Sequence, residues 1–185
     1  MDINVAHWLE RSESNGPGTR FVLWVQGCSL HCPGCWNPDT WSHGPRVSTT
    51  VESIWQTVQA IDGLEGISIS GGEPFEQAAA CADLAELAQA AGLSVLVYTG
   101  KTLETLRLPE HQRLLASVDI LVAGPFVASK LLTGEALLGS SNQRIHLLTR
   151  RYSEADLQNL PVSEVLIRPD GTIVYTGFPE LRIQD

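Results

Sequence analysis

The sequence predicts an α/β fold, in the form of a partial (open) β/α barrel with a mostly parallel sheet. Two observations carry this prediction. Apolar runs of strand length alternate with helical patterns, and the chain has room for about six β-α units and a hairpin. A closed eight-stranded barrel takes about 250 residues, so we expect one domain, residues 1–185, with one open side. An open side suits a macromolecular substrate that inserts a loop.

Seven apolar runs are expected to form strands. In chain order these runs are 21–26, 66–70, 94–99, 118–123, 145–148, 164–168 and 172–175. The last two flank Asp170-Gly171, a dipeptide that favours a tight hairpin turn. Strand-helix-strand order elsewhere makes the crossovers right-handed and the sheet largely parallel.

Two segments have the periodicity of amphipathic helices. In residues 51–61 the apolar side chains recur at helical spacing, and Thr49 and Glu52 are placed as a capping box. Residues 74–91 are rich in alanine and leucine, and Gly92 follows as a helix stop. These helices are expected to cross between neighbouring parallel strands.

Composition and charge exclude several classes of protein. A formal net charge of -9 argues against a nucleic-acid partner. No apolar run approaches the roughly 18 residues of a membrane span, and no leader pattern precedes the domain. The four cysteines do not form the framework of a small secreted protein. We therefore expect an unprocessed cytoplasmic protein without a membrane partner.

Three cysteines, Cys28, Cys32 and Cys35, follow the first predicted strand at C-x3-C-x2-C spacing. This arrangement predicts a 4Fe-4S cluster, in which three cysteines hold three irons and the fourth iron is open to a substrate or cofactor. The alternative is a structural zinc site with His31 or His43 as fourth ligand. Zinc motifs usually divide their ligands into two pairs, which this loop does not.

Two further loops follow predicted strands, where α/β proteins place their ligands. One contains Gly71, Gly72 and Glu73, followed by Pro74. Two residues without Cβ let the backbone approach a ligand closely, and the carboxylate can accept from an ammonium. The other loop is Tyr98-Thr99-Gly100. Cys81, in contrast, lies within the alanine-rich helix and is interpreted as a small buried apolar residue.

These motifs carry a resemblance to a known family. The chain resembles the radical S-adenosylmethionine enzymes, and among them the activating enzymes of glycyl-radical proteins, above all those of anaerobic ribonucleotide reductase. The matching segments are 16–20, 26–38, Trp41, 70–75, 98–100, 124–126 and 139–144. The cysteine motif and the Gly-Gly-Glu-Pro turn indicate the superfamily, and the last two segments indicate the reductase-activating branch.

The resemblance implies a single radical S-adenosylmethionine domain, a 4Fe-4S cluster and a mechanism. One electron, from reduced flavodoxin or ferredoxin, would cleave S-adenosylmethionine to methionine and a 5'-deoxyadenosyl radical. That radical would abstract hydrogen from a glycyl-radical protein such as anaerobic ribonucleotide reductase. The resemblance implies that the three thiols bind the cluster. It implies that Gly71, Gly72 and Glu73 contact the amino group of S-adenosylmethionine, and that Gly34 and Trp36 contact its adenine. Thr99 is a further candidate contact.

Two positions depart from the family pattern, which usually has aspartate where this chain has Asn15 and Ala123. The loss of two carboxylates near a sulfonium ligand and a possible bound cation changes the charge of the site. Two other functions are kept open. One is a radical S-adenosylmethionine enzyme that modifies a peptide or a small molecule, and the other is a zinc-binding interaction module without enzymatic activity.

Overall fold

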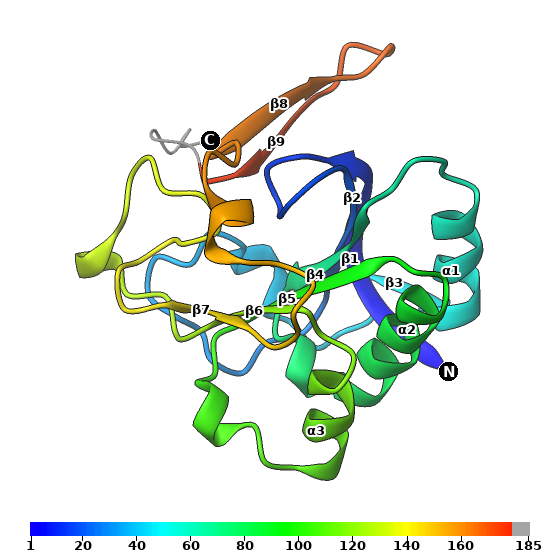
Figure 1. Cartoon of the computed structure of the whole chain (residues 1–185), viewed down its shortest axis with the longest axis horizontal. Coiled ribbons are helices and arrows are strands. Elements are labelled where there is room, and N and C mark those ends of the chain that lie inside the picture. The colour runs from blue at the N-terminus through cyan, green and yellow to red at the C-terminus, as the bar shows by residue number, and fades with distance from the viewer. Residues whose placement is uncertain (179–185) are drawn as a thin grey trace.

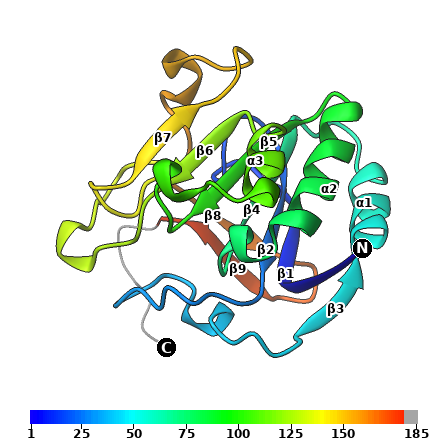
Figure 2. The ribbon, with the colours of Figure 1, turned by 90° about the horizontal axis from the view of Figure 1, so that it is seen from below.

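The computed structural model of the chain describes residues 1–178, and a seven-stranded sheet forms its centre (Figure 1). The strand order across the sheet is β3-β1-β2-β4-β5-β6-β7. Figure 2 shows β3 and β7 at the two opposite edges. The strands are β1 (Asp2–Ser12), β2 (Arg20–Val25), β3 (Val47–Thr50), β4 (Gly66–Gly71), β5 (Ser94–Thr99), β6 (Ile120–Ala123) and β7 (Arg144–Leu147).

The four central strands are parallel, and both edges of the sheet are antiparallel. Strands β2, β4, β5 and β6 pair in parallel, whereas β1 pairs antiparallel with β2 and β3, and β7 pairs antiparallel with β6. The predicted α/β class with an open sheet is confirmed. The expectation of about six β-α units is wrong, because the described chain has three α-helices and reaches β7 through a long loop.

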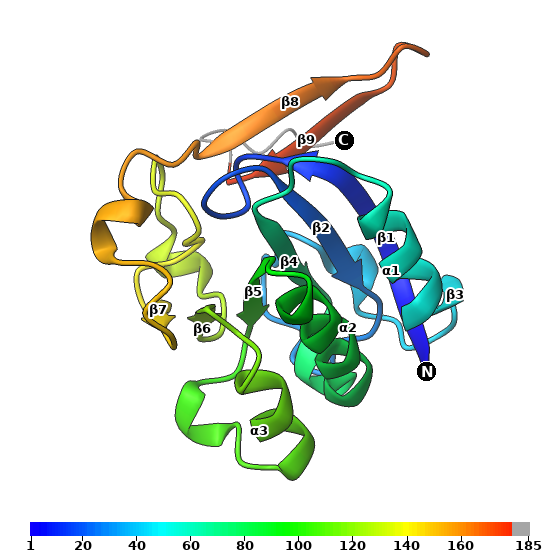
Figure 3. The same cartoon turned by 45° about the vertical axis from the view of Figure 1, so that its right-hand side comes forward.

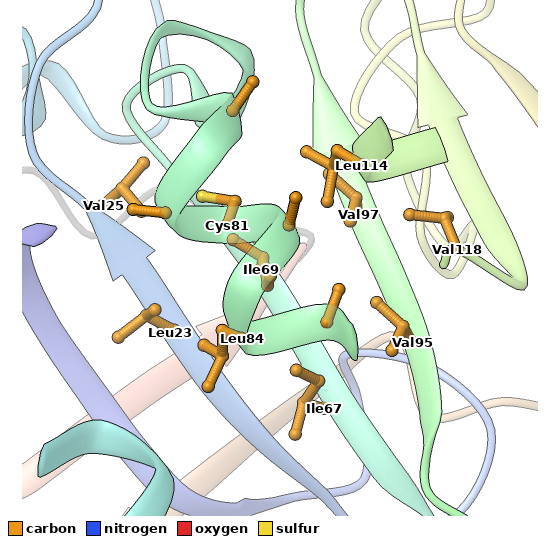
Figure 4. Packing of buried hydrophobic residues seen from close by; sticks show 14 of the residues in the cluster. Leu23, Val25, Ile67, Ile69, Cys81, Leu84, Val95, Val97, Leu114 and Val118 are labelled. Carbon is orange, nitrogen blue, oxygen red and sulfur yellow. The ribbon is translucent and has the colours of Figure 1, made fainter. Parts of the chain in front are cut away.

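All three helices pack on one face of this sheet. They are α1 (Val51–Gln59), α2 (Ala78–Ala90) and α3 (Pro109–Leu115). Alternate residues of the central strands point toward them, as strand geometry requires. Figure 4 shows α2 with Cys81 and Leu84 among these side chains. The labelled residues from β2, β4 and β5 are Leu23, Val25, Ile67, Ile69, Val95 and Val97, and Cys81 is fully buried, as the sequence predicted.

Two predicted helix starts need correction. Thr50, not Thr49, caps α1, and its side chain accepts from the amide of Ser53, so Glu52 is not the partner of a capping box. The second predicted helix is divided: a 3-10 turn, η2 (Pro74–Glu76), precedes α2. Gly92 follows α2 with φ of +81°, and ends it as expected.

Strand β1 was not predicted from the sequence, and neither were β3 and α3. The apolar residues of β1 do not alternate regularly along its length, because its pairing with β2 shifts register between Val5 and His7 and again between Leu9 and Ser12. The pattern by which a half-buried strand is normally detected is therefore interrupted twice.

The second face of the sheet is covered in part by a hairpin made of β8 (Ser163–Ile167) and β9 (Ile173–Gly177). Figure 3 shows it lying across the ends of β1 and β2, on the side away from the helices. Leu166 and Val174 pack against a small apolar cluster that contains Trp24. The predicted hairpin is confirmed, with Gly171 at φ of +86° in the turn.

Polar contacts, in part buried, attach this hairpin to the loop before β2. One carboxylate oxygen of Glu164 accepts from the Ser12 hydroxyl and from the backbone amides of Glu13 and Ser14, at 2.7–2.8 Å. The Asn15 amide group donates to the hydroxyls of Ser12 and Thr176, both at 2.8 Å. A carboxylate at position 15 could not make these donations. An amide at position 15 therefore fits the attachment of the hairpin.

We expect Asn15→Asp to lower the free energy of unfolding by about 1–3 kcal/mol, because a buried hydroxyl would lose its donor and a second carboxylate would face Glu164. Urea unfolding followed by circular dichroism measures this change. Asn159→Asp, the same substitution at an exposed position, is the control and should stay within about 0.5 kcal/mol of the parent. Equal losses in both variants would contradict the role given to Asn15.

Among residues 1–178 no helix is long and apolar enough to span a lipid bilayer.

Candidate functional site

The cysteine loop begins where β2 ends and is fixed at both ends by backbone hydrogen bonds. The amides of Gly27 and Cys28 donate to the carbonyls of Thr40 and Trp41, at 2.8 and 3.1 Å. Inside the loop the Cys35 amide donates to the Cys32 carbonyl at 3.0 Å, and closes a tight turn. All three predicted cysteines line a single cavity of about 120 Å³, which we call the cysteine cavity.

The donor set of this cavity fits an iron-sulfur cluster better than a single ion. Among residues 1–178 no three Cys, His, Asp or Glu side chains are grouped so that they could hold one metal ion. A zinc site needs such convergence, whereas a 4Fe-4S cluster takes each thiolate on a different iron. The two histidines weighed as zinc ligands each contact another side chain. His31 stacks on Trp41, and His43 bonds Glu76 at 2.8 Å.

The Gly-Gly-Glu turn is packed directly against the strand that carries the cysteine loop. Gly72 and Glu73 donate their amides to the carbonyls of Val25 and Gly27, both at 2.8 Å. A Cβ on Gly71 would lie 2.5 Å from the Val25 nitrogen, and a Cβ on Gly72 would overlap the Gly27 carbonyl. Only glycine fits at both positions, so the turn packs directly on the base of the loop.

The carboxylate of Glu73 joins the ends of β4 and β5. Glu73 is fully buried, and its oxygens accept from the Phe75 amide at 3.0 Å, the Thr99 hydroxyl at 2.8 Å and the Gly100 amide at 2.9 Å. Burial raises the pKa of this carboxyl, while these hydrogen bonds oppose the shift. Glu73 and Thr99 line the cysteine cavity and hold its wall in place.

Aromatic side chains close the opposite wall. Trp36 lies edge-to-face with Phe126 and Phe178, with ring centroids 6.5 and 5.8 Å apart. A Cβ on Gly139 would come within 3.1–3.3 Å of all three rings, so this glycine makes room for them. The side chain of Gln143 connects the two segments of this wall. Its Oε1 accepts from the Gly139 amide, and its Nε2 donates to the Gly124 carbonyl. The two segments that indicated the reductase-activating branch thus shape one wall.

A second cavity of about 760 Å³ adjoins the first, and we call it the hairpin cavity. It lies between the sheet and β9 and shares several wall residues with the cysteine cavity, Cys35 and Trp36 among them. Side chains from the carboxyl ends of three parallel strands form its floor. Trp24 of β2 is in register with Ser70 of β4, and Tyr98 of β5 follows on the same face.

The sequence-predicted residues are mostly brought together. Eight of the nine line the cysteine cavity, namely Cys28, Cys32, Cys35, Trp36, Gly71, Gly72, Glu73 and Thr99. Gly34 does not line it: this residue is exposed, and its φ of +73° serves the turn between the second and third cysteines. Phe178 and the residues of β9 were missed, because they lie about 140 residues beyond the cysteine motif and carry no motif of their own.

Fold and site together define an iron-sulfur protein of the α/β class. Residues 14–146 match the family described as 4Fe-4S single cluster domain, which includes the cysteine loop, the Gly-Gly-Glu turn and the strands between them. The matched segment ends within β7 and before the hairpin.

Curated proteins similar to this chain show to which family of iron-sulfur proteins it belongs. An anaerobic ribonucleoside-triphosphate reductase-activating protein of Vibrio cholerae is 37% identical over 144 residues, which is 73% of this chain and 92% of that protein. The Escherichia coli protein of the same name is 34% identical over 143 residues, with 72% and 92% covered. The chain therefore belongs to the family of the anaerobic ribonucleoside-triphosphate reductase-activating proteins.

Two looser likenesses were also found. A pyruvate formate-lyase-activating enzyme of Listeria monocytogenes is 34% identical over 90 residues, which cover 45% of this chain and 36% of that enzyme. Among solved structures, QueE from Escherichia coli aligns with a TM-score of 0.43 at 18% identity, over 55% of this chain and 54% of QueE.

Alanine substitution of Cys28, Cys32 or Cys35 should reduce the iron and sulfide content to background after anaerobic reconstitution, since each thiolate would hold one iron. Cys81→Ala is the matched control, because this thiol is buried in α2 away from the cavity, and burial raises its pKa to about 12. Iron and labile sulfide assays measure the outcome. Full cluster content in any of the first three variants would remove that cysteine from the ligand set.

Thr99→Val should weaken S-adenosylmethionine binding about tenfold, since a buried hydrogen bond to Glu73 is worth about 1.4 kcal/mol. The change keeps the shape of the side chain, so the effect would come from the loss of the hydrogen bonds that the hydroxyl makes with Glu73 and with the Lys101 amide. Anaerobic titration of the reconstituted protein gives the affinity. Thr105→Val, at an exposed site away from the cavity, should bind like the parent protein, and equal affinity in both variants would contradict the role of Thr99.

Proposed function

We propose that this protein is a radical S-adenosylmethionine activating enzyme that installs a glycyl radical on a partner protein, with anaerobic ribonucleotide reductase as the first candidate. One observation carries the proposal. The three-cysteine loop and the Gly-Gly-Glu turn form one hydrogen-bonded unit around one cavity, in a chain that matches 92% of the length of a reductase-activating protein.

The residues of the cavity divide the work of holding the cofactors. Cys28, Cys32 and Cys35 would hold the 4Fe-4S cluster, and the turn of Gly71 and Gly72 would present its backbone to the amino group of S-adenosylmethionine. When bound, the reduced cluster supplies the electron that cleaves S-adenosylmethionine and yields the hydrogen-abstracting radical. The protein's own task is to position the ligand and exclude water.

The direct part played by Glu73 is narrower than the sequence suggested. Both of its carboxylate oxygens accept from groups of the protein, and its side chain is fully buried. We therefore assign Glu73 to positioning the turn, with Thr99 as its partner. Trp36 lines both cavities and would stack on the adenine, whereas Gly34 would act by shaping the loop that places Trp36.

A second candidate function is favoured by the hairpin cavity. Its volume of about 760 Å³ falls within the roughly 300–1,000 Å³ typical of small-molecule sites. An enzyme that modifies a small molecule or a short peptide by the same radical chemistry would use this room for its substrate. In either case a cytoplasmic location with reduced flavodoxin or ferredoxin as electron donor completes the proposal.

The test is electron paramagnetic resonance on the anaerobically reconstituted, reduced protein, first alone and then with S-adenosylmethionine. We expect the cluster signal to change when the cofactor binds, because the open iron is its ligand site. Adding purified anaerobic ribonucleotide reductase should then produce a glycyl radical doublet on the reductase. A cluster signal that never responds would contradict the chemistry. A response without a radical on the reductase would favour the second candidate.

A further inference from the structure

The β8–β9 hairpin lies outside the part of the chain that defines the family. The family model ends at residue 146, and the Vibrio cholerae relative is matched over 92% of its length by 73% of this chain. This chain is therefore the longer one, and the hairpin comes after the shared domain. The properties that the family shares therefore do not account for the function of the hairpin.

The hairpin carries apolar side chains on both of its faces, whereas a two-stranded ribbon at a protein surface commonly has one solvated polar face. The inner face packs Leu166 and Val174 on the sheet. The outer face consists of two cross-strand pairs, Val165 with Tyr175 and Ile167 with Ile173. These four side chains are 52–74% exposed and form a continuous strip, which we call the outer strip.

The open end of the hairpin is attached to the rest of the protein by several hydrogen bonds. The three hydrogen bonds to Glu164 and the contact from Asn15 to Thr176 fix the open end of the hairpin to the loop before β2. At the same end the Phe178 amide donates to the Val162 carbonyl at 2.8 Å and closes the ladder. The outer strip is thus a preformed surface, held in place by polar contacts on the inner face of the hairpin.

The outer strip borders the site itself. Strand β9 contributes wall residues to the hairpin cavity along its whole length, Ile173 and Tyr175 of the strip among them, and that cavity adjoins the cysteine cavity. The β8 half of the strip, Val165 and Ile167, lines neither cavity. A macromolecule that sends a segment into the hairpin cavity would pass β9, which carries Ile173 and Tyr175 of the strip.

We propose that the outer strip is the docking surface for the protein that receives the radical, and that it takes an apolar patch beside that protein's glycyl segment. This inference rests on the proposed function and adds to it the surface by which the partner is recognised. The size of the strip favours this occupant over a second copy of the chain. A stable interface takes about 20–30 residues on each side, and four side chains suit a contact made and released in each activation.

The test uses two variants of the holoenzyme, both changed only in the β8 half of the strip. The first combines Val165→Thr with Ile167→Thr, which keeps the β-branched shape and removes apolar surface. The second is Ile167→Lys, with Leu108→Lys as matched control, since Leu108 is 52% exposed beside α3 and away from the hairpin. The probe is purified anaerobic ribonucleotide reductase, and the readout is the rate of glycyl radical formation against reductase concentration.

We expect both strip variants to need about tenfold more reductase for half-maximal rate, with an unchanged maximal rate. Cleavage of S-adenosylmethionine by the reduced protein without reductase should be the same in all variants, and Leu108→Lys should behave as the parent. Equal concentration dependence in parent and strip variants would overturn the inference and leave the proposed function intact. The inference would also be overturned if sedimentation showed that the parent protein is a dimer, and if the strip variants were monomers that activate the reductase as the parent does. A parent protein that forms no radical on the reductase would remove the proposed function, and the inference would fall with it.

Discussion

The arrangement of the site depends on one interaction, the backbone clamp between the end of β2 and the Gly-Gly-Glu turn after β4. Gly72 and Glu73 donate to the carbonyls of Val25 and Gly27, and the Glu73 carboxylate extends the clamp to the end of β5. Three adjacent parallel strands are thus joined at the rim where their carboxyl ends meet. The cysteine loop leaves from this rim, so its position relative to the turn is set by backbone geometry.

This clamp also explains which features the sequence could reveal. A contact made through amides and carbonyls restricts side chains only where a Cβ would collide, as at Gly71 and Gly72. These glycines and the cysteines could therefore be predicted from the sequence, and eight of the nine predicted residues line one cavity. Gly34 was predicted as a ligand contact but does not line the cavity. In a sequence, a glycine that is needed for a turn cannot be told from one that lets the backbone approach a ligand. The φ of +73° at Gly34 was not deducible from spacing.

The central strands were predictable for a similar reason. Strand β5 was predicted at its observed bounds, 94–99, because it is buried along nearly its whole length and its apolar run is uninterrupted. In strand β1 two register shifts interrupt the alternation of apolar and polar residues. The residue that caps α1 is Thr50, one position after the predicted Thr49. Local patterns identify elements that the core specifies strongly, and leave edges and caps to tertiary packing.

The hairpin shows how an addition to a shared domain can alter a site without touching its chemistry. It closes one side of the hairpin cavity, and it is attached through the amide group of Asn15 and the carboxylate of Glu164. A carboxylate at position 15 would oppose Glu164 and could not donate to the hydroxyls of Ser12 and Thr176, so an amide suits this attachment. The cluster end of the site is built almost entirely from the shared domain. The side that faces the partner is built partly from the hairpin, so binding of the radical acceptor can diverge while the radical chemistry stays the same.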